Sequence, residues 1–360
     1  MNLLFYREIG VFVCEYMASN PHQSKNIVGR GDRTVGAVFF ETLLKTWFLE
    51  QVRKRGGWTN LHAHLDKAYT ISPDRFSQAQ EALPSKWDLM NEIKKKYTKE
   101  DLEKRMRRVL DDMVLQGVHA IRTHIDVDRI VELLPITVAR ELKEEYQNRI
   151  NIQIVAHPLQ GLRDSENRRL FEASLEFADL VGGLPSRDRP RDDLHLQTIF
   201  ELAKKYQKDL DVHVDQENNP DEHETRRLAE LTMKYRMEGR VTAVHAISLS
   251  AQSLEEQHAV AQLLKTAGMN VTICPFAALS MTQLPKQALL HNSIAPLRIL
   301  LEEGVNVSMG VDNIADFFMP YGDGDLWVET RCLMEAARMY DSAIILPLVT
   351  TNGLKTMSLI

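Results

Sequence analysis

The chain has 360 residues, of which 44% are hydrophobic and 26% are charged, a composition typical of a globular protein with a sizeable core. Its formal net charge is −6 and its basic residues are dispersed, so nucleic acid is not expected as a partner. Three cysteines, Cys14, Cys274 and Cys332, form no CxxC pair, which argues against a disulfide framework or a cysteine zinc site and favours a reducing, cytoplasmic compartment.

The first 57 residues differ from the rest of the chain. The opening stretch MNLLFYREIGVFVCEYM is interrupted by Arg7 and Glu8 and has no clear cleavage site, so it predicts neither a signal peptide nor a membrane span. The stretch AVFFETLLKTWFLEQVRKR has apolar residues at the spacing of a helix face. We therefore expect residues 1–57 to be an atypical, partly helical N-terminal segment and residues 58–360 to form the main domain.

In the main domain one unit recurs, consisting of an amphipathic helix, a glycine and a short β-branched strand. Gly117, Gly268 and Gly304 stand at such junctions. Glycine suits the left-handed position that ends a helix, and the Val/Ile run after it suits a buried parallel strand. Five further strands are predicted, at residues 59–64, 150–158, 178–185, 210–215 and 240–246.

Eight strands that alternate with helices predict an α/β fold of the (β/α)8 TIM-barrel type. A doubly wound open sheet is the alternative architecture. No GxGxxG motif or P-loop accompanies the early strands, so the sequence gives no support to a nucleotide-binding form of that sheet.

Histidines and aspartates gather at the predicted carboxyl ends of these strands, where barrel enzymes carry their working residues. His62 and His64 point to the same side of the first strand, because alternate residues of a strand share a face. Two imidazoles side by side in a core are costly unless something binds them. The other strand ends carry His124 with Asp126, His213, His245 and Asp312.

Each of these residues also has an ordinary structural interpretation. A single histidine such as His213 or His245 is more often a hydrogen-bonded structural residue than a ligand, and Asp312 could cap the turn after its strand. Four histidines and one aspartate at corresponding strand ends nevertheless predict a metal site. The remaining histidines are expected to be surface or helix residues: His119, His195, His223 and His258.

The stretches HAHLDK, RTHIDV, DVHVDQ, RVTAVHA and GVDNIADFFMPYGDGD carry this pattern from about residue 58 onward. In combination they resemble the amidohydrolase superfamily, and within it the cytosine deaminase-like branch, which includes enzymes that act on s-triazines such as N-isopropylammelide. The resemblance implies one divalent metal ion, Zn²⁺ or Fe²⁺, held by His62, His64, His213 and Asp312. It also implies that His245 lies beside the metal-bound water.

The chemistry of these residue types agrees with that assignment. Three neutral imidazoles and a carboxylate suit Zn²⁺ or Fe²⁺ and leave a position open for water, whose pKa the ion would lower to about 7. Asp312 could take the proton of this water and pass it to the leaving nitrogen, while His245 could polarise or orient the substituent of the attacked carbon. The HxE and PCxxC motifs of zinc cytidine deaminases are absent, so nucleosides and polynucleotides are not indicated.

Two departures from the family pattern concern the substrate. Cytosine deaminases place a glutamate three residues after the strand 5 histidine, but this chain has Gln216 there. Since an amide cannot carry a proton, either Glu217 or Asp215 turns inward, with Glu217 the nearer candidate, or the substrate needs no such acid. The glutamine that would anchor a pyrimidine amide is displaced by one position, from Leu159 to Gln160. The expected substrate contacts are Gln160, Gln216, Phe318 and His124.

Two further features complete the prediction. Phe317, Phe318 and Tyr321 could wall a planar heterocycle or simply pack their loop. Family members usually build a small β-sandwich from segments before and after the barrel, and the region before NLHAH lacks the expected strands and Pro-Gly entry. We therefore expect this flanking sandwich to be atypical or truncated.

The leading interpretation is a metal-dependent hydrolase of a C–N bond in a small cyclic amidine or amide, a deaminase of a pyrimidine- or triazine-like ring. The alternatives are a non-deaminating hydrolase of cyclic amides or N-alkylamines, and a catalytically impaired metal-binding barrel. Phosphoester hydrolysis at a binuclear site usually needs a lysine on strand 4, which DLVGGLP lacks. The expected partner is a small heterocyclic substrate, with no nucleic acid and no membrane, and self-association into a homo-oligomer is left open.

Overall fold

The computed structural model describes residues 33–81, 83–281 and 292–360, with side chains from residue 43 onward. The chain divides into two compact units, Met1–Gly57 and Trp58–Ile360. The described part of the first unit contains the helix expected there, α3 (Arg33–Lys54). No described helix combines the length and the apolarity that crossing a bilayer requires.

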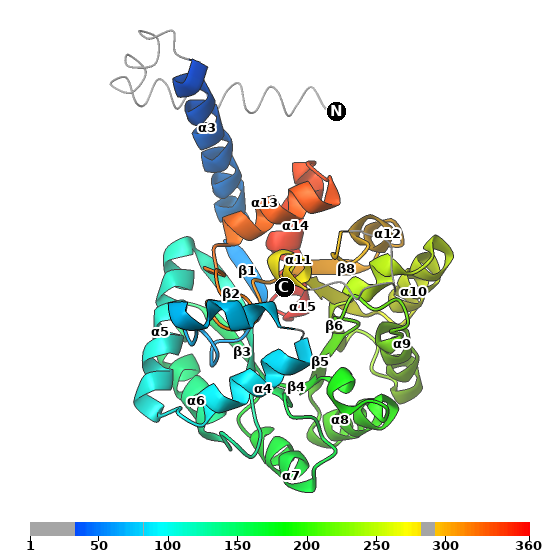
Figure 1. The fold of residues 1–360 in the computed structure, drawn as a ribbon. Coiled ribbons are helices and arrows are strands. Elements are labelled where there is room, and N and C mark those ends of the chain that lie inside the picture. The colour runs from blue at the N-terminus through cyan, green and yellow to red at the C-terminus, as the bar shows by residue number, and fades with distance from the viewer. Residues whose placement is uncertain (1–32, 82, 282–291) are drawn as a thin grey trace. The chain divides into compact units, whose positions relative to one another are not determined.

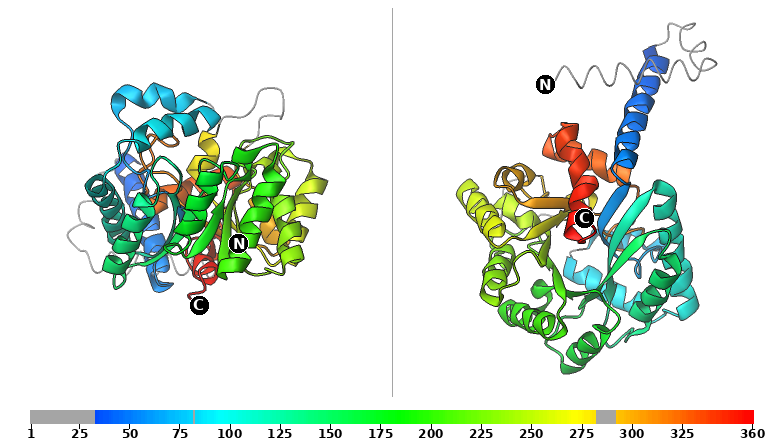
Figure 2. Two further views of the ribbon diagram at one scale, coloured as in Figure 1. Left: turned by 90° about the horizontal axis from the view of Figure 1, so that it is seen from below. Right: turned by 180° about the vertical axis from the view of Figure 1, so that it is seen from behind.

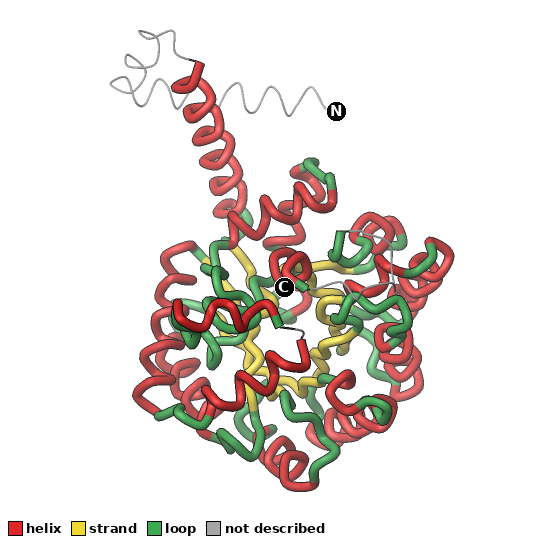
Figure 3. The backbone as a smooth tube through the Cα atoms, in the orientation of Figure 1, coloured by secondary structure: helices red, strands yellow, loops and turns green. Residues whose placement is uncertain are grey.

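The second unit is built on eight parallel strands, and the predicted (β/α)8 barrel is confirmed (Figures 1 and 3). Each strand pairs with the next along the chain, so the spatial order equals the sequence order. The strands are β1 (Trp58–Ala63), β2 (Val118–Asp126), β3 (Asn151–His157), β4 (Leu180–Gly183), β5 (Asp209–Val214), β6 (Val241–His245), β7 (Asn270–Ile273) and β8 (Asn306–Met309).

Helices connect the strands and surround the barrel. Gly117, Gly268 and Gly304 all have positive φ at or just past a helix end, as the recurring helix–glycine–strand unit predicts. The α-helices are α4 (Leu83–Lys94), α5 (Lys99–Gln116), α6 (Leu134–Tyr146), α7 (Ser165–Ser174), α8 (Asp192–Tyr206), α9 (Glu224–Tyr235), α10 (Leu254–Thr266), α11 (Pro275–Ser280), α12 (Leu297–Glu302), α13 (Leu326–Ala337), α14 (Ser342–Val349) and α15 (Thr351–Thr356). Short 3₁₀ segments are η1 (Pro73–Gln80), η2 (Pro185–Asp188) and η3 (Ile247–Ala251).

The two ends of the barrel are covered by different elements. Figure 2 shows α4 on one side of the barrel and the C-terminal helix α15 on the other. Helix α15 packs at the amino ends of the strands, where Leu354 and Met357 join Leu61 and Ala120 in an apolar cluster. The carboxyl ends of the strands, which carry the predicted site, therefore open beneath α4.

The barrel closes between β1 and the segment just after β8. The Asp312 N–H donates to the His62 carbonyl at 2.9 Å, and the His64 N–H donates to the Asp312 carbonyl at 3.2 Å. Three candidate ligands of one metal ion are thus joined through their own backbones. Closing the barrel also places the Asp312 side chain beside the two histidines.

Substituting Gly310 tests this coupling between closure and the site. A Cβ at position 310 would lie 2.5 Å from the His62 nitrogen and 2.7 Å from its carbonyl oxygen, so β1 and β8 would have to separate. We expect Gly310→Ala to lower stability by about 1–3 kcal/mol and to reduce metal content after metal loading. Gly304→Ala is the control for metal content, because a Cβ there would meet only the flexible Lys265 side chain at 3.5 Å or more. Its φ of 77° disfavours alanine, so this variant should lose some stability but keep its metal content. Normal metal content and melting temperature in Gly310→Ala would contradict the coupling.

Candidate active site

Four predicted metal ligands meet at the carboxyl end of the barrel. The Asp312 Oδ1 lies 3.3 Å from the His62 Nε2 and 3.2 Å from the His64 Nε2. The His213 Nε2 lies 3.4 Å from the His64 Nε2. All four side chains are buried. The strand pattern predicted only that these residues share one end of the barrel. The structure adds that the ligand atom of each lies within 3.4 Å of the ligand atom of at least one of the others.

These distances suit a shared ion. Ligand atoms held about 2.0–2.2 Å from one tetrahedral ion are roughly 3.3–3.6 Å apart. Both ring nitrogens of His62 and the Asp312 Oδ1 are buried without a hydrogen-bond partner in the described chain. Unpaired buried polar atoms are costly, and a cation bound by the His62 Nε2 and the Asp312 Oδ1 would satisfy two of these three atoms. In donor type and in these three neighbouring distances, the four residues therefore fit the divalent metal ion that the family resemblance implies.

The protonation states also suit coordination. Burial lowers the pKa of His62. Burial together with Lys67 lowers that of His64 well below its usual value, and burial together with the neighbouring histidines does the same for His213, so the three rings are neutral at pH 7. Burial alone would raise the pKa of Asp312, but the close approach of the His62 and His64 rings to its carboxylate holds it well below its usual range. Neutral imidazole and ionised carboxylate are the forms that bind metal ions.

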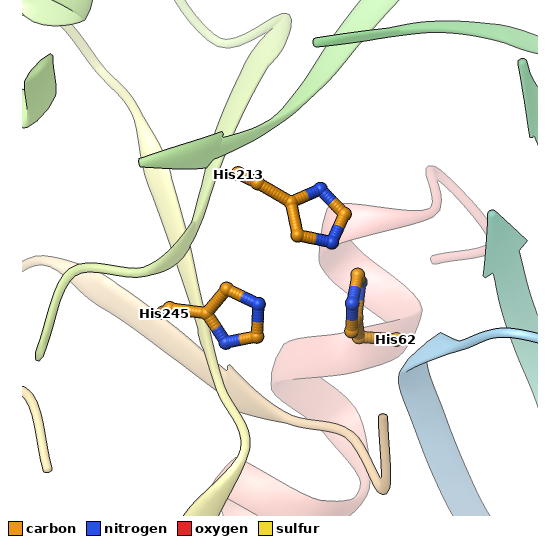
Figure 4. Close-up of side chains that lie close together, drawn as sticks. All are labelled: His62, His213 and His245. Atoms are coloured by element: carbon orange, nitrogen blue, oxygen red, sulfur yellow. The ribbon is translucent and has the colours of Figure 1, made fainter. Parts of the chain in front are cut away.

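His245 lies beside this group. Figure 4 shows its imidazole facing those of His62 and His213, and the ligand atoms of the three rings lie within 4.8 Å of one another. The His245 Nε2 is 3.9 Å from the second carboxylate oxygen of Asp312, Oδ2. Burial lowers the pKa of His245 to about 4, so this ring too is neutral at pH 7.

The backbone is strained at two of these residues. His245 has φ 76° and Asp312 has φ 60°, the left-handed region that residues other than glycine rarely adopt. Such conformations cost about 1–3 kcal/mol each and cluster at functional sites. Both side chains lie at the mouth of the barrel, with the His245 Nε2 3.9 Å from the Asp312 Oδ2.

His124 lies behind the ligands. Its Nε2 is 2.9 Å from the Asp211 Oδ1, and Asp211 is also paired with Arg122. The His124 ring centroid is 4.5 Å from that of His62 and 4.7 Å from that of His213. His124 is not among the side chains that line the cavity. It therefore lies beneath the candidate ligands and does not reach the place where a substrate contact was predicted.

A cavity opens above the candidate metal site, and its walls are mainly apolar. Phe318 lies on the wall as predicted, whereas Phe317 belongs to a buried apolar cluster and Tyr321 is 80% exposed. The apolar lining includes Leu83, Trp87, Leu159, Leu184, Phe318 and Met319. The polar lining includes Gln216, Asn313, Lys67 and Lys86.

The structure does not bring Gln160 into the cavity. Its side chain donates to the Asn91 Oδ1 and accepts a hydrogen bond from Arg187, while Leu159 occupies the cavity wall. The one-residue displacement seen in the sequence therefore turns the amide away, because the chain has left β3 and changes direction there. The prediction that Gln160 contacts the substrate is therefore corrected: its side chain links α4 to η2.

Glu217 is also directed away from the cavity. The Arg189 guanidinium donates to Glu217 at 3.2 Å and is paired with Glu222 and Glu224 as well. Asp215 accepts hydrogen bonds from the N–H groups of Glu224 and Thr225, so it caps α9. Neither carboxyl group turns inward, and Gln216 is the residue of this segment that lines the cavity. The expectation that Glu217 supplies an acid is corrected accordingly.

Two cavity residues were missed by sequence reasoning. His157 ends β3, and its ring centroid lies 4.6 Å from that of His213 and 5.3 Å from that of His64. Its position at a strand end was the signal that could have identified it. Lys67, in the stretch HAHLDK, donates to the Asp126 Oδ1 at 2.6 Å. The partner of Lys67 comes from another strand and could not be read from the sequence.

Among the remaining histidines, His195 is on helix α8 but fully enclosed. Its Nδ1 lies 2.6 Å from Asp188, and its Nε2 accepts a hydrogen bond from the Leu184 N–H. His195 therefore supports the loop after β4 from outside the metal cluster.

The fold and the site define a TIM-barrel protein with a histidine–aspartate cluster at the carboxyl ends of its strands. The chain belongs to the amidohydrolase family, whose profile matches residues 58–358. This confirms the resemblance drawn from the sequence, and the family with its deaminase relatives supports a hydrolase that acts on C–N bonds.

Three relatives illustrate the relationship. The N-isopropylammelide isopropyl amidohydrolase of Pseudomonas sp. is 30% identical over 320 residues, covering 84% of this chain and 74% of that protein. The pterin deaminase of Rhizobium rhizogenes is 27% identical over 280 residues, covering 74% of this chain and 62% of that protein. The crystal structure of 5-methylcytosine deaminase from Klebsiella pneumoniae with 5-fluorocytosine has a TM-score of 0.78 and 25% identity, covering 84% and 74% of the two chains.

Proposed function

We propose that the protein is a metal-dependent hydrolase that cleaves an exocyclic C–N bond of a small pyrimidine-, triazine- or pterin-like ring, releasing ammonia. The observation that carries the proposal is the convergence of His62, His64, His213 and Asp312 at the bottom of a cavity with flat apolar walls. Relatives that deaminate pterins and 5-methylcytosine, or hydrolyse N-isopropylammelide, support the same class of reaction.

His62, His64, His213 and Asp312 would hold the ion, Zn²⁺ or Fe²⁺. When bound, such an ion lowers the pKa of water and polarises the attacked carbon's substituent. Asp312 would accept the proton of the attacking water and deliver it to the leaving nitrogen. Its Oδ2 suits this role, because it faces His245 at 3.9 Å while Oδ1 faces the other two histidines.

His245 would orient the reacting groups as a neutral imidazole. With its pKa lowered to about 4 by burial, it donates or accepts a hydrogen bond without carrying a charge at pH 7. Trp87 and Phe318 supply flat surfaces for a planar ring, and Gln216 supplies an amide edge. A planar heterocycle with hydrogen-bonding edges matches these walls.

Release of an alkylamine is the second candidate function. Gln216 lines the cavity and stands at the sequence position where cytosine deaminases carry the acid that protonates the ring nitrogen, and Glu217 is held by Arg189. A substrate that needs no such acid is therefore favoured, and a relative acts on N-isopropylammelide. Both candidates use the same water attack and differ in the amine that leaves.

A turnover screen tests the proposal and separates the candidates. Purified protein loaded with Zn²⁺ or with Fe²⁺ under anaerobic conditions would be incubated with aminopyrimidines, aminotriazines, N-alkylaminotriazines, pterins and cyclic ureas. Ammonia and primary amines would be measured separately. Turnover by metal-loaded protein, abolished by chelation, is the expected result. No turnover by protein with full metal content would contradict the hydrolase and favour a catalytically impaired metal-binding barrel.

Gln216→Glu and Glu217→Gln together test which residue faces the ring. We expect Gln216→Glu to raise deamination of an aminopyrimidine by about tenfold, because general acid catalysis contributes roughly 10²–10⁴-fold when well placed. Glu217→Gln should change turnover by less than about threefold, since this carboxyl group already accepts from Arg189 outside the cavity. A large loss of activity in Glu217→Gln, with Gln216→Glu inert, would show that the segment rearranges when substrate binds.

A further inference from the structure

Helix α4 covers the cavity with one apolar face that contains a lysine. Leu83, Trp87 and Met90 of this face join Leu159, Leu184 and Phe317 in an apolar cluster. Lys86 lies between them in the helical i, i+3, i+4, i+7 pattern and is 9% exposed. The side chain lines the cavity, at a position where packing alone would select leucine or methionine.

A second lysine on the same face, Lys94, is neutralised by two carboxylates of the protein. Lys94 Nζ lies 3.0 Å from the Asp126 Oδ2 and is also paired with Asp128. For Lys86, by contrast, no carboxylate lies within 4.0 Å in the described ranges of the chain.

The acidic groups nearest to the cavity are already engaged. Asp316 accepts hydrogen bonds from the N–H groups of Phe318 and Met319 and from the Asn313 amide. Asp126 accepts from Lys67. Asp312 lies against the histidines of the candidate metal site. The charge of Lys86 is therefore not neutralised by an ion pair with these carboxylates.

Such a lysine costs the fold stability. Burying an ammonium group without an ion pair is unfavourable, and burial lowers the pKa of Lys86 although Asp316 opposes this. The cost is recovered if an anion enters the cavity, because a charge-assisted hydrogen bond there is strengthened by the apolar surroundings.

We propose that Lys86 determines specificity by binding a negative charge on the substrate, so that the ring taken up is anionic, through a carboxylate substituent or an ionised ring oxygen. That the bound anion is a substrate rests on the proposed hydrolase function. Binding of the anion depends only on the cavity and can be measured without turnover.

Calorimetric titration of the metal-loaded protein with four probes tests the inference. Uracil-6-carboxylate and its neutral methyl ester differ in an exocyclic charge. Barbiturate, whose ring is ionised at pH 7, differs from neutral uracil by this charge and by one ring oxygen. Wild-type protein should bind at least one anion about tenfold or more tightly than its neutral counterpart. Lys86→Met should lose that preference and Lys86→Arg should keep part of it. Lys95→Met, which alters an exposed lysine directly after the same helix, should keep it fully.

Melting temperature supplies a second readout. Lys86→Met should fold at least as stably as wild type without ligand, because a buried unpaired charge is replaced by an apolar side chain of similar length. Unchanged anion preference in Lys86→Met would overturn the inference and assign the preference to the metal ion or Lys67. The inference would also be overturned if wild-type protein showed no preference for the anions or bound none of the probes. If no ring is hydrolysed but the Lys86-dependent preference is present, the hydrolase proposal fails and the anion site stands.

Discussion

Asp312→Asn is expected to abolish turnover, with a loss of about 10²–10⁴-fold or more. The asparagine amide cannot accept the proton of the attacking water, although it has nearly the same size and shape as the carboxylate that it replaces. The structure gives the two carboxylate oxygens separate surroundings, since Oδ1 faces His62 and His64 and Oδ2 faces His245. Initial rates would be measured with the best substrate from the turnover screen, together with metal content for each preparation.

Asp323→Asn is the matched control, because Asp323 is exposed in the same loop after β8 and an amide oxygen can replace its hydrogen bond to the Asp325 N–H. Its rate should stay within about threefold of wild type. A rate for metal-loaded Asp312→Asn that also stays within this range would exclude Asp312 as the base. Reduced metal content in Asp312→Asn would require rates to be expressed per bound ion.

His62→Ala is expected to lose the divalent metal ion almost completely. His62 is fully buried, and neither ring nitrogen has a hydrogen-bond partner in the described chain. Removing one of four ligands leaves an incomplete coordination shell. Elemental analysis after metal loading and extensive dialysis should show about one ion per wild-type chain and little in the variant. The increase in melting temperature on adding Zn²⁺ to the apo protein should also disappear, because that increase reports binding to the native state.

His119→Ala separates this effect from a general loss of histidine. His119 is exposed on β2 and hydrogen-bonds with Asn151 at the far end of that strand from Asp126. The control should retain full metal content and the Zn²⁺-dependent increase in melting temperature. Full metal content in His62→Ala would refute the ligand assignment at β1.

The sequence alone determined the architecture and the end of the barrel at which the candidate site lies. Strand and helix periods are properties of short segments, so the eight strands and the glycines that precede three of them could be recognised locally. The carboxyl ends of parallel barrel strands must meet at one rim, which brought His62, His64, His213, His245 and Asp312 to the same end without knowledge of any contact. The structure places all five there.

Tertiary structure decided the direction of the side chains that follow the strands. Gln160, Glu217 and Asp215 lie in loops, where the strand alternation that orients a side chain no longer applies. Arg189 draws Glu217 outward, and the start of α9 holds Asp215. The sequence could not reveal these partners, because each contact joins segments whose relative placement depends on the folded loops.

The same reason separates two lysines of one helix. From the sequence, Lys86 and Lys94 are equivalent basic residues among apolar ones. In the folded protein Lys94 reaches Asp126 and Asp128 at the end of β2, whereas Lys86 faces the cavity. The helical period put both lysines on the buried face of α4. Only the packing of α4 across the barrel mouth decided that the charge of Lys94 is neutralised by carboxylates of the protein and that Lys86 is left to bind a ligand.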